Sequence, residues 1–294
     1  MAENRPLLRS DLLRIARESH VPPEVIEKDY ALSYLLAGLA GVQELGELCF
    51  KGGTALKKIY FGDYRFSEDL DFTAIEAPRS KDLEAAMDRA RSAAERLLQE
   101  RGRFQVEFDR PPEQEPHPTG QESFRFRFAF PWQPRPMVRV KVEITFDEPV
   151  LLEAPVRPLL HGYEALGENL TAEIKTYAIE EIVAEKLRAL RQTQRRLEER
   201  GWNRPRARDY YDLWRLLTDY RVLVDTAVVT GILKQKFAVR GVGFAGPSDF
   251  FSDQLVSEAR STWHSNLGIF VADLPPVDEV LARLRLAVEK LING

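Results

Sequence analysis

Cysteine is almost absent from this chain, because Cys49 is the only one among 294 residues. A single cysteine cannot form an intrachain disulfide, so we expect a protein of a reducing compartment, the cytoplasm. Cys49 stands in an apolar segment and is better interpreted as a small core residue than as a nucleophile. The four histidines show no zinc-ligand spacing, and no Ser-His-Asp or Cys-His arrangement indicates nucleophilic catalysis.

Long apolar runs and an excess of one charge are missing as well. The longest apolar stretch near the start, 31–42, is shorter than a membrane span of roughly 20 residues, and residues 1–13 show no signal-peptide pattern. We therefore expect no membrane partner. The 42 Lys+Arg and 46 Asp+Glu give a net charge of −4, so total charge does not indicate a nucleic-acid partner. With 44% hydrophobic residues, the chain is long enough for one large or two modest folded domains.

The order of patterns along the chain predicts an α+β fold followed by helices. Half-buried strands are predicted by alternating apolar and polar residues over 104–108, 124–130 and 138–146. Apolar residues recur at helical spacing over 79–100, and from about Thr176 onward helical periods dominate. We predict a mixed β-sheet with flanking helices over residues 1–170 and a mainly helical domain over 171–294.

Two consecutive glycines stand just before a predicted helix. Gly52 and Gly53 stand between a short apolar strand and a predicted helix, where backbone N–H groups can face an anion such as phosphate. A Gly-Gly pair before a helix is also a common turn without a ligand. The next motif decides between these interpretations.

Asp69 and Asp71 flank Leu70 in a predicted strand, so both carboxylates point to one face. Such a pair repels itself unless a cation or a proton lies between the two groups, which suits Mg²⁺. A solvated strand edge is the alternative. Together the two motifs predict a triphosphate held by Gly52, Gly53 and Thr54, facing a metal held by the two aspartates.

Two charged residues fall on apolar faces of predicted helices. At 100° per residue, Lys186 lies in the middle of an apolar stripe that begins at Ile179, and Asp209 lies on the apolar stripe of the next helix. A buried ammonium needs an anion. The partner is either Asp209, in an ion pair between the two domains, or a phosphate. Asp209 is alternatively a first-turn residue favoured by the helix dipole.

Positive charge is concentrated near those two residues. Residues 186–221 contain 11 Lys+Arg against five acids, a local charge of +6, which leaves −10 for the remainder. With Trp202 among them, seven arginines form a possible track for an RNA backbone: Arg191, Arg195, Arg196, Arg200, Arg204, Arg206 and Arg208. A solvated arginine-rich helix explains them equally well.

Several of these motifs, in this order, resemble the AbiEii/AbiGii-type nucleotidyltransferase toxins of bacterial toxin–antitoxin and phage-defence systems, within the DNA polymerase β-like superfamily. The runs that carry the resemblance are EKDYALSYLL at 27–36, FKGGTALKKIY at 50–60, RFSEDLDF at 65–72, VKVEITF at 140–146, EEIVAEKLRAL at 180–190 and RARDYYDLW at 206–214. The spacer 54–68 is slightly longer than is usual in the superfamily.

The resemblance implies an enzyme that transfers a nucleoside monophosphate from an NTP to an acceptor hydroxyl, with Mg²⁺ as cofactor. It implies the tRNA 3′ end as the leading acceptor, so that translation is blocked, and a cognate antitoxin as partner. A protein side chain or a small molecule as acceptor, or a catalytically silent nucleotide-binding regulator, are the alternatives.

The same resemblance implies roles for six further residues. Those expected to bind phosphates or the metal-bound triphosphate are Lys58, Arg65, Ser67 and Lys186. Asp209 is expected to organise the nucleotide or help to activate the acceptor. By position, Glu143 resembles a third catalytic acid, although alternation along a surface strand explains it nearly as well.

Overall fold

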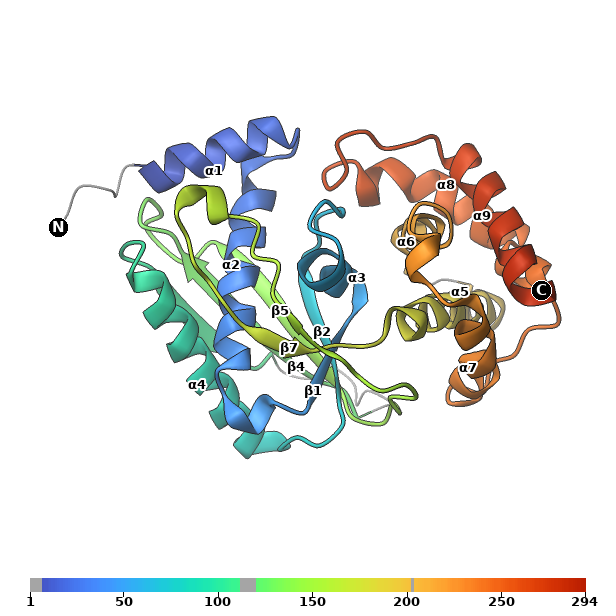
Figure 1. The fold of residues 1–294 in the computed structure, drawn as a ribbon, viewed down its shortest axis with the longest axis horizontal. Helices are drawn as coiled ribbons and strands as arrows, with labels where there is room; N and C mark the ends of the chain where they lie inside the picture. The colour runs from blue at the N-terminus through green and yellow to red at the C-terminus, as the bar shows by residue number, and fades with distance from the viewer. Residues whose placement is uncertain (1–6, 112–119, 202–203) are drawn as a thin grey trace. The chain divides into compact units, whose positions relative to one another are not determined.

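The computed structural model describes residues 7–111, 120–201 and 204–294, which belong to two compact units (Figure 1). The first unit is Met1–Tyr177 and the second is Ala178–Gly294. This division falls after strand β7 (Glu173–Lys175), whereas the boundary expected from the sequence falls before it. We describe each unit by itself.

A five-stranded mixed sheet forms the centre of the described part of the first unit. Its strand order is β1-β2-β5-β4-β3. The strands are β1 (Leu48–Lys51), β2 (Asp69–Ala74), β5 (Val138–Thr145), β4 (Glu122–Ala129) and β3 (Gln105–Asp109). β2 and β5 run parallel, and the other neighbours are antiparallel. The alternating patterns therefore predicted the strands at their observed places, and the α+β class is confirmed.

One face of this sheet is apolar and is covered by two helices, α2 (Pro23–Ala40) and α4 (Ser80–Gln99), as Figure 1 shows. α2 begins at a proline, which suits a first helical turn. Gly38 allows the two helices to approach closely, because a Cβ there would lie 2.6 Å from the backbone oxygen of Ala90. The buried apolar side chains of β4 and β5 point to these helices, and apart from the buried Glu122 the charged residues of both strands lie on the opposite face.

Further elements of the first unit pack beside α2 and the edge of the sheet. α1 (Leu7–Glu18) packs on α2, and β6 (Val156–Pro158) pairs with β7. Thr176, just after β7, forms a parallel bridge with Phe50 on β1. The two-stranded piece is thereby attached to the edge of the main sheet.

The second unit is helical, as predicted. Its helices are α5 (Ile179–Arg200), α6 (Ala207–Leu217), α7 (Thr226–Ala238), α8 (Asp253–Leu267) and α9 (Val277–Asn293). α5 ends at Gly201, whose left-handed φ of +73° is a conformation that favours glycine. Asp225 and Ser252 accept backbone N–H bonds at the starts of α7 and α8.

None of the helices within the described ranges is long and apolar enough to span a membrane.

Candidate functional site

The glycine turn packs directly against the acidic strand β2. Gly52 has a φ of +81°, and a Cβ on it would lie 2.8 Å from Oδ2 of Asp71. One residue after the glycines, Thr54 donates from Oγ1 to the backbone oxygen of Asp69 at 2.5 Å. The structure therefore brings together the two motifs that the sequence places 16 residues apart. The close approach of Asp71 explains the glycine at position 52, and the hydrogen bond to Asp69 explains the hydroxyl-bearing residue at position 54.

The second glycine is covered by two predicted phosphate ligands. A Cβ on Gly53 would lie 2.6 Å from a guanidinium nitrogen of Arg65 and 3.3 Å from Oγ of Ser67. Arg65 is mostly buried and also donates to the backbone oxygen of Phe66 at 3.1 Å. A cationic and a hydroxyl group thus lie beside backbone N–H groups of the turn, a set of donors that suits phosphate oxygens.

We expect Gly52→Ala to lower nucleotide transfer by about tenfold or more and the free energy of unfolding by about 1–2 kcal/mol. The alanine is strained at positive φ and its Cβ pushes on Asp71. Gly62→Ala is the matched control, because no atom lies within 4 Å of a Cβ there. Thermal unfolding and initial transfer rates measure both effects, and equal behaviour of the two variants would contradict this account of the turn.

Three carboxylates lie on the polar face beside the turn. Asp69 and Asp71 alternate with the buried Leu70, as predicted. In the parallel pairing of β2 with β5, Glu143 is the partner of Asp71 and Lys141 is the partner of Asp69. Lys141 forms an ion pair with Glu143. The predicted third acid is therefore next to the aspartate pair on the adjacent strand.

The electrostatics at this place favour a cation. Burial raises the pKa of Asp69, and the negative charges of Glu143 and Glu68 raise it further. Lys28 offsets part of this through an ion pair with Glu68 at 3.0 Å. Hard carboxylate oxygens suit Mg²⁺, which takes few protein ligands and completes its shell with water and substrate phosphates. Within the described ranges no group of three or more His, Cys, Asp or Glu residues has the arrangement of a metal site, so the fit rests on the aspartate pair.

Lys58 has a different environment from the other predicted phosphate ligands. Its ammonium lies 2.6 Å from Oδ2 of Asp29 in a buried ion pair. It also donates to the backbone oxygen of His161 at 3.4 Å. The structure therefore places Lys58 in the core of the first unit, while the assignment as a phosphate ligand stays a prediction.

In the second unit, Lys186 is held by two carboxylates. Its Nζ lies 2.8 Å from Oδ1 of Asp209 and 2.7 Å from Oδ2 of Asp212. Arg206 contacts the other oxygen of Asp209 at 3.2 Å. Burial by itself raises the pKa of Asp209, but Lys186 and Arg206 outweigh it and hold the pKa below its usual value. The ion pair considered from the sequence is thus present, but it joins α5 to α6 within one unit and not two domains.

Asp212 is the residue that the sequence analysis missed in this cluster. It is fully buried and lies one helical turn after Asp209. A second aspartate at a spacing of three on an otherwise apolar helix face is a signal that the sequence contains. The cluster of two acids and two bases is neutral in sum.

The comparisons with known proteins agree with this architecture. Residues 34–283 match the family described as nucleotidyl transferase AbiEii toxin of type IV toxin–antitoxin systems. The chain therefore belongs to the AbiEii family of nucleotidyltransferase toxins, and it is a nucleotidyltransferase. No curated protein matches the chain closely enough to be counted as a relative.

Among solved structures, the fold is similar to that of MenT4, a nucleotidyltransferase toxin from Mycobacterium tuberculosis H37Rv. The TM-score is 0.65 at 20% sequence identity, and the match covers 97% of this chain and 90% of that one. The likeness extends over both units and concerns the fold.

Proposed function

We propose that this protein transfers a nucleoside monophosphate from an NTP to the 3′-terminal hydroxyl of an RNA, most naturally a tRNA, in a Mg²⁺-dependent reaction. The contact of Gly52 with Asp71 carries the proposal, because it joins a turn suited to phosphate with a carboxylate pair suited to a metal. In such a reaction the acceptor oxygen attacks the α-phosphorus, and the bond from that phosphorus to pyrophosphate breaks. Added nucleotides at the tRNA 3′ end would block aminoacylation and hence translation.

In this proposal the residues of the first unit have three roles: metal binding, triphosphate binding and proton acceptance. Asp69 and Asp71 would hold Mg²⁺, whose charge offsets the negative charge that develops on the phosphates. Backbone N–H groups at Gly53 and Thr54 bind the triphosphate, with the side chains of Arg65 and Ser67 beside them. Glu143, adjacent to Asp71 on β5, is placed to accept the proton of the attacking hydroxyl.

The proposal includes Lys186 as a ligand of the triphosphate and Asp209 as the group that orients it or helps to activate the acceptor. The ammonium of Lys186 is held in place by its two aspartate partners. A phosphate can take the place of one carboxylate, because both are oxygen anions that accept from an ammonium.

The arginines of the second unit support RNA as the acceptor, although not all of them are available to it. Four of them have partners within the fold, and one of these is Arg206, which donates to Oγ1 of Thr193 at 2.7 Å and forms an ion pair with Asp209. Arg191 donates to backbone oxygens of Gly243 and Asp249, Arg195 to Glu199 and to the backbone of Gly241, and Arg208 to the backbone of Asn266. Trp202 lies outside the described residues.

A second group of arginines, from the end of α5, the start of α6 and the end of α7, lies around Arg196. Burial lowers the pKa of Arg196, and the positive charges of four neighbours lower it further: Arg206, Arg200, Arg240 and Arg204. Like charges at this density favour binding of a polyanion. This cluster supports the proposal that the RNA backbone contacts the second unit around Arg196.

We expect the double substitution Arg196→Ala/Arg200→Ala to weaken RNA binding and to reduce the slope of log Kobs against log[salt] by about 1.4 in magnitude. Each lost phosphate contact on a single strand accounts for about 0.7. Arg195→Ala is the control on the same helix, since its guanidinium already binds Glu199. Fluorescence anisotropy with labelled tRNA at several salt concentrations measures the slopes, and an unchanged slope in the double variant would remove the cluster from the RNA surface.

The function is tested by incubating the protein with Mg²⁺, each of the four NTPs labelled in the α-phosphate, and total cellular RNA. We expect label on RNA of tRNA size and none when Mg²⁺ is chelated. Label on protein or on small molecules alone would replace the RNA proposal with one of the alternative acceptors. We further propose that the protein acts in the cytoplasm, where its RNA substrate lies, and that a cognate antitoxin counteracts it.

A further inference from the structure

The segment that follows the two glycines is an unusual turn that buries two consecutive lysines. α3 (Gly52–Ala55) continues into a π-helix, η2 (Leu56–Tyr60), which closes with a bond from N of Phe61 to the backbone oxygen of Leu56 at 2.8 Å. π-turns are rare in proteins, but those that occur are often found at functional sites. Lys57 is 8% exposed and Lys58 is 1% exposed, so both ammonium groups depend on protein partners.

Lys57 holds the loop that leads from this turn to β2. Its Nζ donates to the backbone oxygens of Gly62 and Tyr64, at 3.1 and 3.2 Å, and lies 4.2 Å from the ring centre of Phe66. That loop carries Arg65, which covers Gly53. Lys57 thus fixes the loop that holds Arg65 beside Gly53.

Lys58 ties the same turn to α2. Asp29 accepts through Oδ2 from Lys58 at 2.6 Å and from the hydroxyl of Tyr163 at 2.9 Å. The backbone of Lys58 is held as well, because N of Leu160 donates to its oxygen at 2.7 Å. Side chain and main chain of Lys58 are therefore fixed by α2 and by the segment 159–163.

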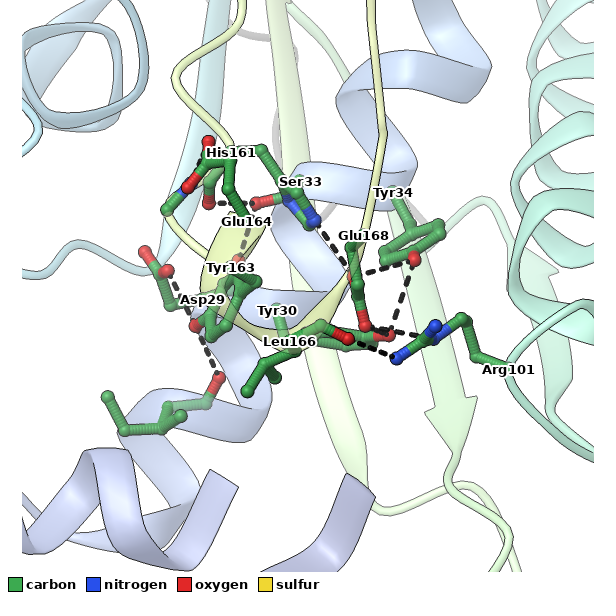
Figure 2. Close-up of polar contacts among 12 residues, drawn as sticks. Asp29, Tyr30, Ser33, Tyr34, Arg101, His161, Tyr163, Glu164, Leu166 and Glu168 are labelled. Atoms are coloured by element: carbon green, nitrogen blue, oxygen red, sulfur yellow. Dashed lines mark hydrogen bonds and ion pairs between the residues drawn. The ribbon is translucent and has the colours of Figure 1, made fainter. Parts of the chain in front are cut away.

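That segment is itself anchored on α2 by a second buried carboxylate, Glu168 (Figure 2). Tyr30 and Tyr34 donate to it at 2.7 and 2.9 Å, Nε2 of His161 lies 2.8 Å from it, and Nε of Arg101 lies 3.0 Å from it. Burial raises the pKa of Glu168, but these donors outweigh it and hold the pKa below its usual value. The carboxylate thus connects α2, Arg101 just after α4, and the segment 161–168.

Stability alone does not explain why a buried ion pair such as Asp29–Lys58 is present. The loss of hydration of two buried ions cancels much of their attraction, and apolar pairs of similar size are often as stable. Burial lowers the pKa of Lys58, and the charge of Asp29 counters part of this effect. What the pair provides is a fixed position for the π-turn. Gly52 and Asp71 lie so close together that a Cβ would not fit between them, so even a small movement of the turn changes their contact.

We propose that Asp29 is a positioning residue of the nucleotidyl-transfer site: by holding Lys58 it fixes the π-turn, and through the π-turn it holds Gly52 and Gly53 against Asp71 and Arg65. This inference rests on the proposed function of the glycine turn. It gives Lys58 a role inside the protein and not on the triphosphate.

The test compares Asp29→Asn, Lys58→Met and the double variant. Asp29→Asn leaves the buried ammonium without its counter-charge, and we expect kcat to fall about tenfold to 100-fold with a smaller change in KM for NTP. The double variant removes that ammonium and keeps an acceptor for Tyr163, so it should recover a large part of the lost kcat. If Lys58 contacts the triphosphate instead, Lys58→Met and the double variant both raise KM and the second substitution restores nothing, which would overturn the inference.

A second readout does not depend on transfer activity. In Asp29→Asn, amide hydrogen exchange over residues 52–60 should rise about tenfold or more at a temperature where the variant remains folded. Glu181→Gln is the matched control, because Glu181 forms an equally buried ion pair with Lys236 in the second unit. We expect it to lower Tm without changing exchange at 52–60. Unchanged exchange in Asp29→Asn contradicts the inference even if transfer by the wild type fails to confirm the proposed function.

Discussion

Asp69→Asn is expected to abolish nucleotide transfer while making the folded chain more stable. Transfer should fall roughly 100-fold or more, because in the proposed function Asp69 is one of the two metal ligands. The pKa of Asp69 is higher in the folded chain than its ordinary value of 3.8, so unfolding releases a proton and stability falls as pH rises through this window. The amide has no charge to repel Glu143 and Glu68. The gain in Tm should therefore be present at pH 7 and vanish below about pH 3.8.

Thermal unfolding in EDTA and in Mg²⁺ completes this comparison. Mg²⁺ should raise the Tm of the wild type. At a Mg²⁺ concentration of 100 times Kd, the free energy of unfolding should increase by about 2.7 kcal/mol. The Tm of Asp69→Asn should not change. Asp82→Asn, an exposed aspartate on α4, is the control and should transfer normally. A variant at position 69 that retains full transfer would remove this carboxylate from the site.

Lys186→Met is expected to have the second largest effect, on stability as well as on transfer. It leaves Asp209 and the fully buried Asp212 without their shared ammonium, which costs about 3–5 kcal/mol at pH 7. In the wild type the lowered pKa of Asp209 gives stability that is present at neutral pH and is lost only as pH falls below 3.8. In the variant the two carboxylates lack the ammonium and bind protons more readily, so the deficit should shrink as pH is lowered from 7 toward 4.

A double variant separates structure from chemistry at this cluster. Lys186→Met combined with Asp212→Asn removes one of the two buried negative charges that lose the ammonium, and it should recover part of the lost stability in urea unfolding. Transfer should remain absent if Lys186 binds the triphosphate, as proposed above. Recovery of transfer together with stability would show that Lys186 acts only within the fold. Lys234→Met, an exposed lysine on α7, serves as the control for loss of one positive charge.

The parts of the structure that the sequence predicted are those with local signals. The strict alternation over β4 and β5 reports directly which side chains are buried, because a strand has a period of two. The same period placed Asp69 and Asp71 on one face, and the positive φ of Gly52 explains why a glycine precedes the turn. These inferences need only residues close together in the chain.

The parts that the sequence did not predict depend on contacts between distant residues. Asp29 and Lys58 are typical surface residues in composition, and only the folded chain shows that each is the other's buried partner. Glu168 likewise gathers donors from α2 and from beyond α4. The π-turn has no simple sequence period. Burial of charge is therefore the feature that sequence patterns alone conveyed least well here.

The central claim is that a nucleotide is transferred to the 3′ end of RNA, and periodate tests it most directly. Purified tRNA is divided into an intact sample and one whose terminal cis-diol has been oxidised, and each is incubated with the protein, Mg²⁺ and α-labelled NTPs. The account predicts label at the 3′ terminus of intact tRNA and none on the oxidised sample. Equal labelling of both samples, or label on protein alone, would contradict it.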